Sequence, residues 1–436
     1  MKRSLTALFL CFMLCLTAAG CGRRLPQPTG AAGEETVSSA ESESGTRAGS
    51  EGAAHAESEG ATHAESEGET HAESEGAAHA ESEGAAHAES EESTAESGEG
   101  ESTPAEGLTV LTLNAVGDCT LGNDVDQPQD RCFNAMYRQV GNDLDYFLGG
   151  VRQIFAADDL TIANLECTLT DRGAEAQKVW SFRGEPSYAK ILSRSSVEAA
   201  TFANNHNRDY GDVSYTDTIS HLTAEGVAVA VEDRTVLLEV KGIKVGLFAV
   251  QSAFLAGEGT ANREYYDTGA LKARTDSCIS ALKAQGAQLI IAAYHWGIEG
   301  ADSVTAQQKE LGHYAVDRGA DLVLGTHPHC LQPVECYQGR YIVYSLANFC
   351  YGGHTNPGDK DTFIWQQQFC FADGVLTDCR AARLIPCSLS GASDRNDYRP
   401  VTVSGNAAQN IISRINRMNG SAGFSLRIGG DGTVSP

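Results

Sequence analysis

The chain has 436 residues, with 58 acidic and 32 basic side chains and a formal net charge of −26 at pH 7. A chain this acidic, with no basic stripe, argues against nucleic acid as a ligand. The excess is concentrated in one place: residues 34–106 carry 21 acidic side chains and one basic side chain, whereas residues 107–436 carry 37 and 27. The second part is therefore only mildly acidic, and it is long enough for one large α/β core.

The first residues have the pattern of an export signal. Lys2 and Arg3 precede a short apolar run, and "AAGC" then leads to Cys21. The run is too short for a membrane span. "AAGC" resembles the bacterial lipobox, although Ala18 stands where leucine is usual. We expect a lipoprotein signal over 1–21, with the protein exported and anchored by Cys21 on the outer face of the bacterial cell membrane. The alternative is a secreted protein with an incidental cysteine.

Residues 22–107 are predicted to be a disordered acidic stalk. The segment "HAESEGA" recurs every eight residues and contains no apolar side chain larger than alanine, so it cannot form a core. Its negative charges repel one another and keep a spacer extended. Five histidines recur at equivalent positions: His55, His63, His71, His79 and His87. They could bind a metal loosely, but a solvated stalk is the simpler interpretation.

Helical and apolar patterns alternate from residue 108 to residue 390. Strands are expected at 108–117, 160–166, 289–296 and 321–326, and helices at 269–286 and 305–320. This alternation predicts parallel strands covered by helices. Patterns centred on Lys241-Gly242 and Gln338-Gly339 predict two hairpins, at 235–250 and 334–348. The fold class is therefore α/β with mixed sheets.

Polar residues follow several of the expected strands. They are Asp118, Glu166, Asn205, His206, His295, His327 and His329. Because ligands of open α/β sheets bind outside the carboxyl ends of strands, these side chains are expected to form one site. Singly, Asp118 could cap a turn and His295 could be an ordinary core histidine. A carboxylate that ends an apolar strand, as Glu166 does, is costly to bury unless it is paired or metal-bound.

Two short segments carry the strongest signal. "ANNHNRDYG" places Asn205, His206 and Asp209 in one short loop, and packing alone requires no such set. His327 and His329 flank Pro328, which fixes the local backbone and points both imidazoles the same general way. Imidazole, carboxylate and amide groups together suit divalent metal ions.

Six blocks carry a family resemblance. They are "VGDCTLG", "NLECTLT", "NNHNRDYG", "HWGIE", "GADLVLGTHPHCLQPVE" and "YSLANF". In order and spacing they resemble the poly-γ-glutamate capsule biosynthesis protein A (CapA) family of the calcineurin-like metallophosphoesterase superfamily. The resemblance implies a CapA-like domain over 108–390. It also implies a four-layer α/β sandwich of two mixed β-sheets flanked by helices, with two divalent metal ions (Mn, Fe, Zn or Mg) between the loops.

The resemblance also implies roles for individual residues. Glu166 takes the place of the bridging carboxylate. Asn205, His295 and His327 resemble the ligands of one metal, and Asp118 and His329 resemble those of the other. His206 resembles the histidine that protonates the leaving oxygen, with Asp209 orienting it. Apart from the resemblance, Arg183 in "WSFRGEP" is the best cationic candidate to hold an anionic substrate; the alternative is an ordinary surface arginine.

One position departs from the superfamily pattern, which usually begins with Asp-x-His. Here Asp118-Cys119-Thr120 lacks the histidine, so Cys119 or a water is expected to complete the site. Two functions stay open. One is a metal-dependent hydrolase acting on a phosphoester or an anionic surface polymer. The other is a non-catalytic component of a polymer export or anchoring assembly, with membrane partners in capsule synthesis.

The chain ends in a predicted extension over 391–436. Residues 406–419 place Ile411, Ile412, Ile415 and Met418 on one helical face, which is expected to pack on the core. The glycine-rich tail after Gly420 is expected to be mobile. The ten cysteines after Cys21 are scattered, so disulfides are possible but their pairing is not predicted.

Overall fold

The computed structural model describes residues 107–252 and 267–436. The predicted signal peptide with Cys21 lies outside the described residues, as does the predicted stalk apart from Gly107. Within the described ranges, no helix has both the length and the hydrophobicity that a membrane span requires.

The first of two main sheets has nine strands in the order β17-β16-β14-β1-β2-β5-β6, with β13 beside β1 and β15 beside β14. Its strands are β1 (Leu108–Thr120), β2 (Leu160–Leu165), β5 (Ala199–Thr201), β6 (Ala228–Ala230), β13 (Asn348–Tyr351), β14 (Asp361–Ala372), β15 (Val375–Leu376), β16 (Ala382–Ser388) and β17 (Val401–Thr402). β1 is parallel to β2 and β13 but antiparallel to β14, so the sheet is mixed.

The second sheet has six strands in the order β11-β12-β10-β9-β8-β7. They are β7 (Val236–Val240), β8 (Ile243–Gln251), β9 (Leu289–His295), β10 (Leu322–Thr326), β11 (Val334–Tyr337) and β12 (Arg340–Val343). The four inner strands are parallel, and a hairpin closes each edge. Lys241-Gly242 and Gln338-Gly339 have positive φ at both turn residues, as the two predicted hairpins require.

Helices cover the outer face of each sheet. They are α1 (Phe133–Gln139), α2 (Arg152–Phe155), α3 (Ala189–Ser193) and α4 (Asp212–Ala224) on the first sheet, and α5 (Thr268–Ala284) and α6 (Ala306–Arg318) on the second. On β9, Leu289 and Ile291 enter the cluster between the sheets, whereas Ile290 and Ala292 face α5 and α6. The layers are therefore helix, sheet, sheet and helix, and the predicted four-layer fold class is confirmed.

Local sequence explains where the helices of the second sheet begin and end. Thr305 caps α6 by accepting a hydrogen bond from the Gln308 backbone N–H, and the Gln308 side chain accepts one from the Thr305 backbone. Gly319 follows the last turn with φ of 109°, a conformation that strongly favours glycine. Asp267 caps α5 in the same way through Gly269 N–H.

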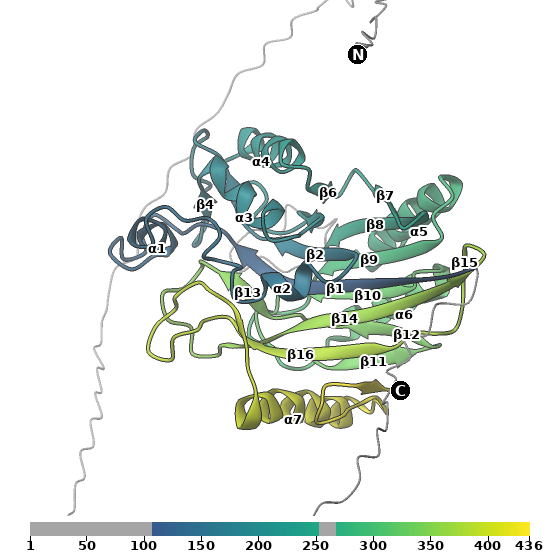
Figure 1. Cartoon of the computed structure of the whole chain (residues 1–436). Helices are drawn as coiled ribbons and strands as arrows, with labels where there is room; N and C mark the ends of the chain where they lie inside the picture. The colour runs from purple at the N-terminus through teal and green to yellow at the C-terminus, as the bar shows by residue number, and fades with distance from the viewer. Residues whose placement is uncertain (1–106, 253–266) are drawn as a thin grey trace, which may run out of the picture. The chain divides into compact units, whose positions relative to one another are not determined.

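The C-terminal residues pack on the same core. α7 (Gly405–Ala422) lies along β16 and β11 (Figure 1), with Ile411, Ile412 and Ile415 buried in the cluster between the sheets. The predicted helical face is therefore correct. The tail after Gly420 differs from the expectation of a mobile segment: β18 (Arg427–Ile428) and β19 (Val434–Ser435) form a two-stranded sheet. Its apolar residues explain the difference, since Leu426, Ile428 and Val434 are buried.

Cysteines in the described ranges are free thiols. Two small elements complete the fold. They are a 3-10 turn (Pro186–Tyr188) and a parallel strand pair, β3 (Thr168–Leu169) with β4 (Arg183–Gly184).

Gly117 allows the close approach that positions the end of β1. A Cβ at Gly117 would lie 1.8 Å from the Ala347 carbonyl oxygen, so only glycine fits. We expect Gly117→Ala to lower the free energy of unfolding by about 1–3 kcal/mol or more, because backbone must move. Gly358→Ala is the control, since no atom lies within 4 Å of its added methyl group; its effect should stay within about 0.5 kcal/mol. Urea unfolding of both variants checks this, and equal midpoints would contradict it.

Candidate metal centre

The candidate site continues the inner faces of the strands. Inward-facing side chains recur every second residue along a strand. On β2, Leu160 and Ile162 belong to the central cluster, and Asn164 and then Glu166 follow at the same spacing. On β9, His295 follows the inward-facing Ala293 in the same way. The polar residues therefore occupy the carboxyl end of the space between the two sheets.

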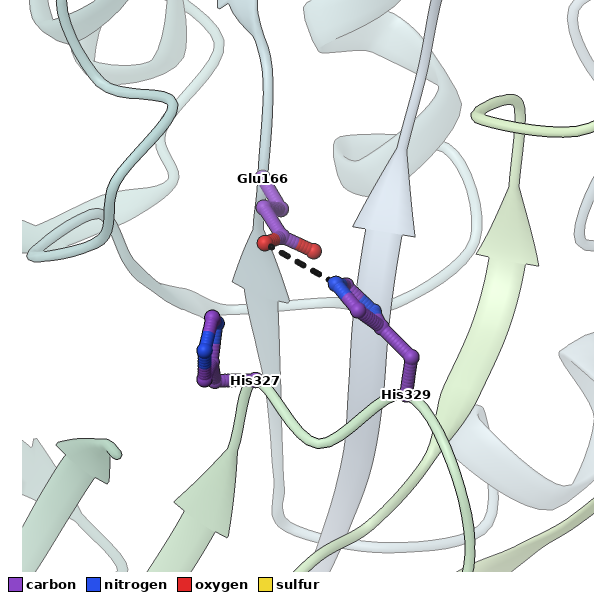
Figure 2. Close-up of side chains that lie close together, drawn as sticks. All are labelled: Glu166, His327 and His329. Atoms are coloured by element: carbon purple, nitrogen blue, oxygen red, sulfur yellow. Dashed lines mark ion pairs between the residues drawn. The ribbon is translucent and has the colours of Figure 1, made fainter. Parts of the chain in front are cut away.

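Glu166 is the centre of the cluster. Its carboxylate is fully buried, and His327 and His329 approach it from the loop after β10, as Figure 2 shows. His329 Nε2 lies 3.7 Å from Glu166 Oε1, and His295 Nε2 lies 3.3 Å from the same oxygen. Three imidazoles, two from one loop and one from the end of a strand, thus surround one carboxylate.

Asp118, near the end of β1, lies beside the same cluster. Its Oδ1 accepts a hydrogen bond of 2.7 Å from Asn164 Nδ2, and its Oδ2 lies 3.3 Å from His329 Nδ1. Asn205 reaches the other side of the cluster, where its Oδ1 lies 2.7 Å from His295 Nε2. All six residues predicted as metal ligands are therefore neighbours in space.

Two sets of donor atoms among these carboxylates and imidazoles could each hold a metal ion. Glu166, His327 and His329 form one set whose donor atoms lie within 4.8 Å of one another, and Asp118, Glu166 and His295 form a second. Glu166 belongs to both sets, as a bridging carboxylate would. His327 and His295 remain close, with ring centroids 4.8 Å apart.

The backbone around Pro328 is unusual. His327 has φ of 94° and His329 has φ of 58°, both in the left-handed region that disfavours side chains with a Cβ. Such strain at two candidate ligands is typical of functional sites that the surrounding structure holds in place.

Unpartnered buried atoms test whether a metal fits. Both carboxylate oxygens of Glu166 and both ring nitrogens of His327 are buried and form no hydrogen bond with the described residues. Buried polar groups are normally paired, so these four atoms indicate a missing partner. Imidazole nitrogens with carboxylate and amide oxygens suit divalent ions such as Zn, Mn and Fe. The residues therefore fit a divalent metal.

Burial and mutual charge set the protonation of the ion-free cluster. Burial lowers the pKa of His295 to about 3 and holds that of His327 well below its usual value. Burial, together with the charge of Asp118, raises the pKa of Glu166 well above its usual value. Burial opposes the charged form of His329, but Glu166 and Asp118 outweigh it and raise the His329 pKa to about 10. Burial also opposes ionisation of Asp118, yet His329 outweighs it and lowers the Asp118 pKa.

Several neighbours orient these candidate ligands, and among them the sequence singled out neither Thr326 nor Asn348. Thr326 Oγ1 lies 2.9 Å from His295 Nδ1, and Asn348 Oδ1 lies 2.9 Å from His329 Nδ1. Asn164 links Asp118 to Asn204 and Thr201. Such partners fix ring orientation in metal sites. Asn348 lies in "YSLANF", so that block was the available signal for it.

The structure excludes Cys119 as the replacement for the missing histidine. Its side chain lies in the apolar cluster between the first sheet and its helices, and burial raises the thiol pKa to about 12. Adjacent residues of a strand face opposite sides, so Cys119 points away from Asp118. Thr120 stands at the histidine position instead, with a buried hydroxyl that has no hydrogen-bond partner among the described residues.

His206 and Asp209 form a hydrogen-bonded pair beside the cluster. His206 Nδ1 lies 2.7 Å from Asp209 Oδ2. Lys178, which the sequence did not single out, forms an ion pair with Asp209 and lies 3.3 Å from His206 Nδ1. Its Nζ also donates to the Asn205 carbonyl, over 2.7 Å. Burial lowers the pKa of His206, and the charge of Asp209 opposes this shift.

Arg183 lies apart from this cluster. Its guanidinium stacks on Tyr210, 4.2 Å from the ring centroid, and it lines a separate cavity of about 170 Å³ with Thr170 and Glu185. Its role as an anion-binding residue stays a prediction.

Fold and site together define an α/β protein with a candidate divalent metal centre at the carboxyl ends of its strands. A model of the family "Bacterial capsule synthesis protein PGA_cap" matches residues 112–352, more than half of the chain. The chain therefore belongs to that family.

Curated relatives agree with this assignment. The "PGA biosynthesis protein CapA" of Bacillus subtilis is 27% identical over 264 residues, which cover 58% of this chain and 66% of the relative. The "Capsule biosynthesis protein CapA" of Bacillus anthracis is 28% identical over 268 residues, which cover 57% and 62%. The match thus spans slightly less than two thirds of these relatives.

Solved structures are more distant. A putative 5′-nucleotidase from Staphylococcus aureus is 12% identical, with a TM-score of 0.38, over 71% of this chain and 58% of that one. The NAD nucleotidase of Haemophilus influenzae is also 12% identical, with a TM-score of 0.33, over 71% and 56%. Similarity at this level carries no argument about function.

Metal content tests the site directly. We expect the purified chain, without a histidine tag and after dialysis against Mn²⁺ or Zn²⁺, to hold about two ions, because two donor sets share Glu166. Changing both His327 and His329 to alanine should remove at least one ion, as measured by elemental mass spectrometry. A matched variant, His221→Ala on α4, should keep both. Equal metal in all three proteins would contradict this site.

Metal affinity should depend on pH. His329 holds a proton below a pKa of about 10, and the pKa of Glu166 is raised, so an entering ion must displace protons. Affinity for Mn²⁺ should therefore rise with pH between 6 and 8, by about tenfold per unit for each proton released. Titration calorimetry in buffers of different ionisation enthalpy counts those protons. A pH-independent affinity would contradict the protonation described.

Proposed function

We propose that this chain is a metal-dependent hydrolase of capsule polymer metabolism, acting on a phosphoester or on an anionic polymer of the cell surface. The observation that carries the proposal is the set of unpartnered buried atoms on Glu166 and His327 beside a His206–Asp209 pair. A structural metal alone would not need a hydrogen-bonded histidine and aspartate next to it.

The proposal assigns chemistry to each group. Bound divalent ions would supply Lewis acidity and lower the pKa of water. Asp118, Glu166, Asn205, His295, His327 and His329 would hold those ions. Asp209 fixes the ring of His206 through Nδ1, and His206 Nε2 forms no hydrogen bond with the described residues. While Nδ1–H donates to Asp209, Nε2 is the nitrogen that would take up a second proton and pass it to the leaving atom of a bound substrate.

Lys178 and Phe182 hold this pair in place. Lys178 balances the charge of Asp209, which is fully buried, and the Phe182 backbone N–H donates to Asp209 Oδ2 over 2.5 Å. The Phe182 ring lies against the imidazole, with centroids 4.5 Å apart. His206 is thus restrained on two sides, which is what general acid catalysis requires of its geometry.

Location and partners complete the proposal. Lys2, Arg3 and the "AAGC" segment ending at Cys21 support export and lipid anchoring on the outer face of the membrane. The acidic repeats between Cys21 and the folded domain suit a spacer. Membrane proteins of capsule synthesis are the expected partners, in line with the names of the Bacillus relatives.

A second candidate is a non-catalytic component of a polymer export or anchoring assembly. Thr120 favours this second function. In the superfamily pattern that the sequence resembles, a histidine imidazole stands at this position, whereas Thr120 has a hydroxyl. The donor set around Asp118 is smaller as a result. An assembly component would keep its cellular role without any hydrolysis.

Two variants separate these functions. His206→Ala should lower hydrolysis of bis(p-nitrophenyl) phosphate or of a γ-linked glutamyl oligomer by about 100-fold or more, while metal content stays unchanged, because His206 acts as an acid and not as a ligand. Asn205→Ala should lower both activity and metal content. His221→Ala serves as the control.

The outcome that contradicts catalysis is equally clear. If metal-loaded chain hydrolyses neither probe, or if His206→Ala restores full capsule formation in cells that lack the protein, the assembly role replaces the hydrolase.

A further inference from the structure

Two cysteines lie opposite each other at one end of the first sheet. β14 and β16 are antiparallel, with Gln367 opposite Ala382. Cys370 stands three residues further along β14, and Cys379 stands three residues before Ala382. The same register, continued by three residues, therefore places the two cysteines across from each other. Residues in such positions have Cβ atoms about 4.5–5.5 Å apart.

Backbone hydrogen bonds hold Cys379 near this position. The Gln368 N–H donates to the Ala381 carbonyl over 2.8 Å, which continues the pairing of β14 and β16 towards the cysteines. From the other side, the Thr377 N–H donates to the Cys370 carbonyl over 2.8 Å, and the Cys379 N–H donates to Thr377 Oγ1 over 3.3 Å. Cys379 is therefore tied on both sides to the strand that carries Cys370.

The two thiols are close enough to influence each other. Burial raises the pKa of Cys370 to about 11, and the neighbouring Cys379 thiol contributes to the shift. A disulfide joins Cβ atoms about 3.5–4.5 Å apart, so a small approach of Cys379 would suffice. Residues 377–381 belong to no strand or helix, and this approach therefore leaves the sheet undisturbed.

Exposure distinguishes this pair from other clustered cysteines. Cys379 is exposed, and Cys370 is 7% exposed. Cys119, Cys167 and Cys350 also share one cluster, but all three are fully buried among apolar side chains, where an oxidant has no access. Cys370 and Cys379 therefore combine proximity with access.

We propose that Cys370 and Cys379 form a disulfide in an oxidising environment. The oxidant is a disulfide, RSSR, of a small thiol or of an exported protein. The exposed Cys379 thiolate attacks RSSR and releases one RSH, and the Cys370 thiolate then attacks the Cys379 sulfur of that mixed disulfide and releases the second RSH. The two thiols lose two electrons, RSSR gains them, and the two thiol protons end on the RSH molecules. Outside the cell, where the predicted export signal would take the chain, disulfides form and persist.

The bridge would strengthen the place where the folded domain begins. It would close residues 371–378 into a loop, and within that loop the Asp373 N–H donates to the Gly107 carbonyl over 3.0 Å. Leu108, the first residue of β1, pairs with Ala372 of the same loop. The bridge would thus secure the hairpin that holds the first residues of β1.

Peptide mapping of the whole purified chain tests the pairing. The chain is incubated with an excess of oxidised glutathione, free thiols are blocked with N-ethylmaleimide, and the protein is digested. Trypsin releases residues 361–380, in which Cys370 and Cys379 are the only cysteines, and an Asp-specific protease then cuts between the two. We expect mass spectrometry to show residues 361–372 joined to residues 378–380, with no maleimide on either fragment.

Thermal unfolding gives a second measurement. The bridge should raise the midpoint by about 5 °C relative to the chain in dithiothreitol, because it restricts the unfolded chain. Cys379→Ser should abolish both the linked fragments and this rise, and it should fold because its side chain is exposed. Cys278→Ser, which changes a cysteine on α5, is the matched control and should keep both.

Two results would overturn the proposal. One is N-ethylmaleimide on both cysteines after treatment with the oxidant, and the other is glutathione or a different cysteine as the stable partner of Cys379. Neither readout requires metal or hydrolysis, so a failure of the proposed function would leave this inference unaffected.

Discussion

The structure depends on the burial of two carboxylates in one place. Asp118 and Glu166 both have no exposed surface, and they end neighbouring parallel strands. Transferring an ionised carboxylate from water into a protein interior costs several kcal/mol unless charge and hydrogen bonds compensate. In the ion-free cluster a proton on His329 compensates in part. A divalent cation would compensate more completely and would satisfy the atoms of Glu166 and His327 that have no partner.

The same constraint explains the order of layers around the site. Polar and charged side chains are tolerated only beyond the apolar layer between the sheets. The inward-facing residues of β2 and β9 are therefore apolar at Ile162 and Ile291 and polar further along each strand, at Asn164 and His295. Gly117 then lets the segment before Asn348 approach β1 closely enough to bring Asn348 opposite Asp118. Asn348 can therefore hold His329, although it lies on a separate strand.

Much of this arrangement could be predicted from the sequence, because local patterns determine it. The alternation of strands and helices, the two glycine hairpins and the polar residues after strands all have short-range causes. The segment "GADLVLGTHPHC", which forms a strand followed by the loop with both histidines, is one example. Contacts between residues far apart in the sequence could not be predicted from local patterns. Nothing near Lys178 in the sequence indicates its ion pair with Asp209, and nothing near Gly420 shows that Leu426 and Ile428 find a core to enter.

The metal grouping shows a similar limit. A sequence gives the types of donors but not which oxygen of Glu166 faces which ring, since rotamers and loop geometry decide that. It also left Cys119 as a possible ligand, because strand register near the bulge between Asp118 and Thr120 determines which residue faces inward.

The left-handed backbone at His327 and His329 has a consequence for which substitutions this chain can accept. Residues other than glycine pay a conformational penalty there, so the fold itself would favour glycine at both positions. The two histidines thus lower the stability of the chain that carries them. If a related protein no longer needed a metal site, these two positions could accept other residues. Glycine at either position would then raise the free energy of unfolding while removing the site.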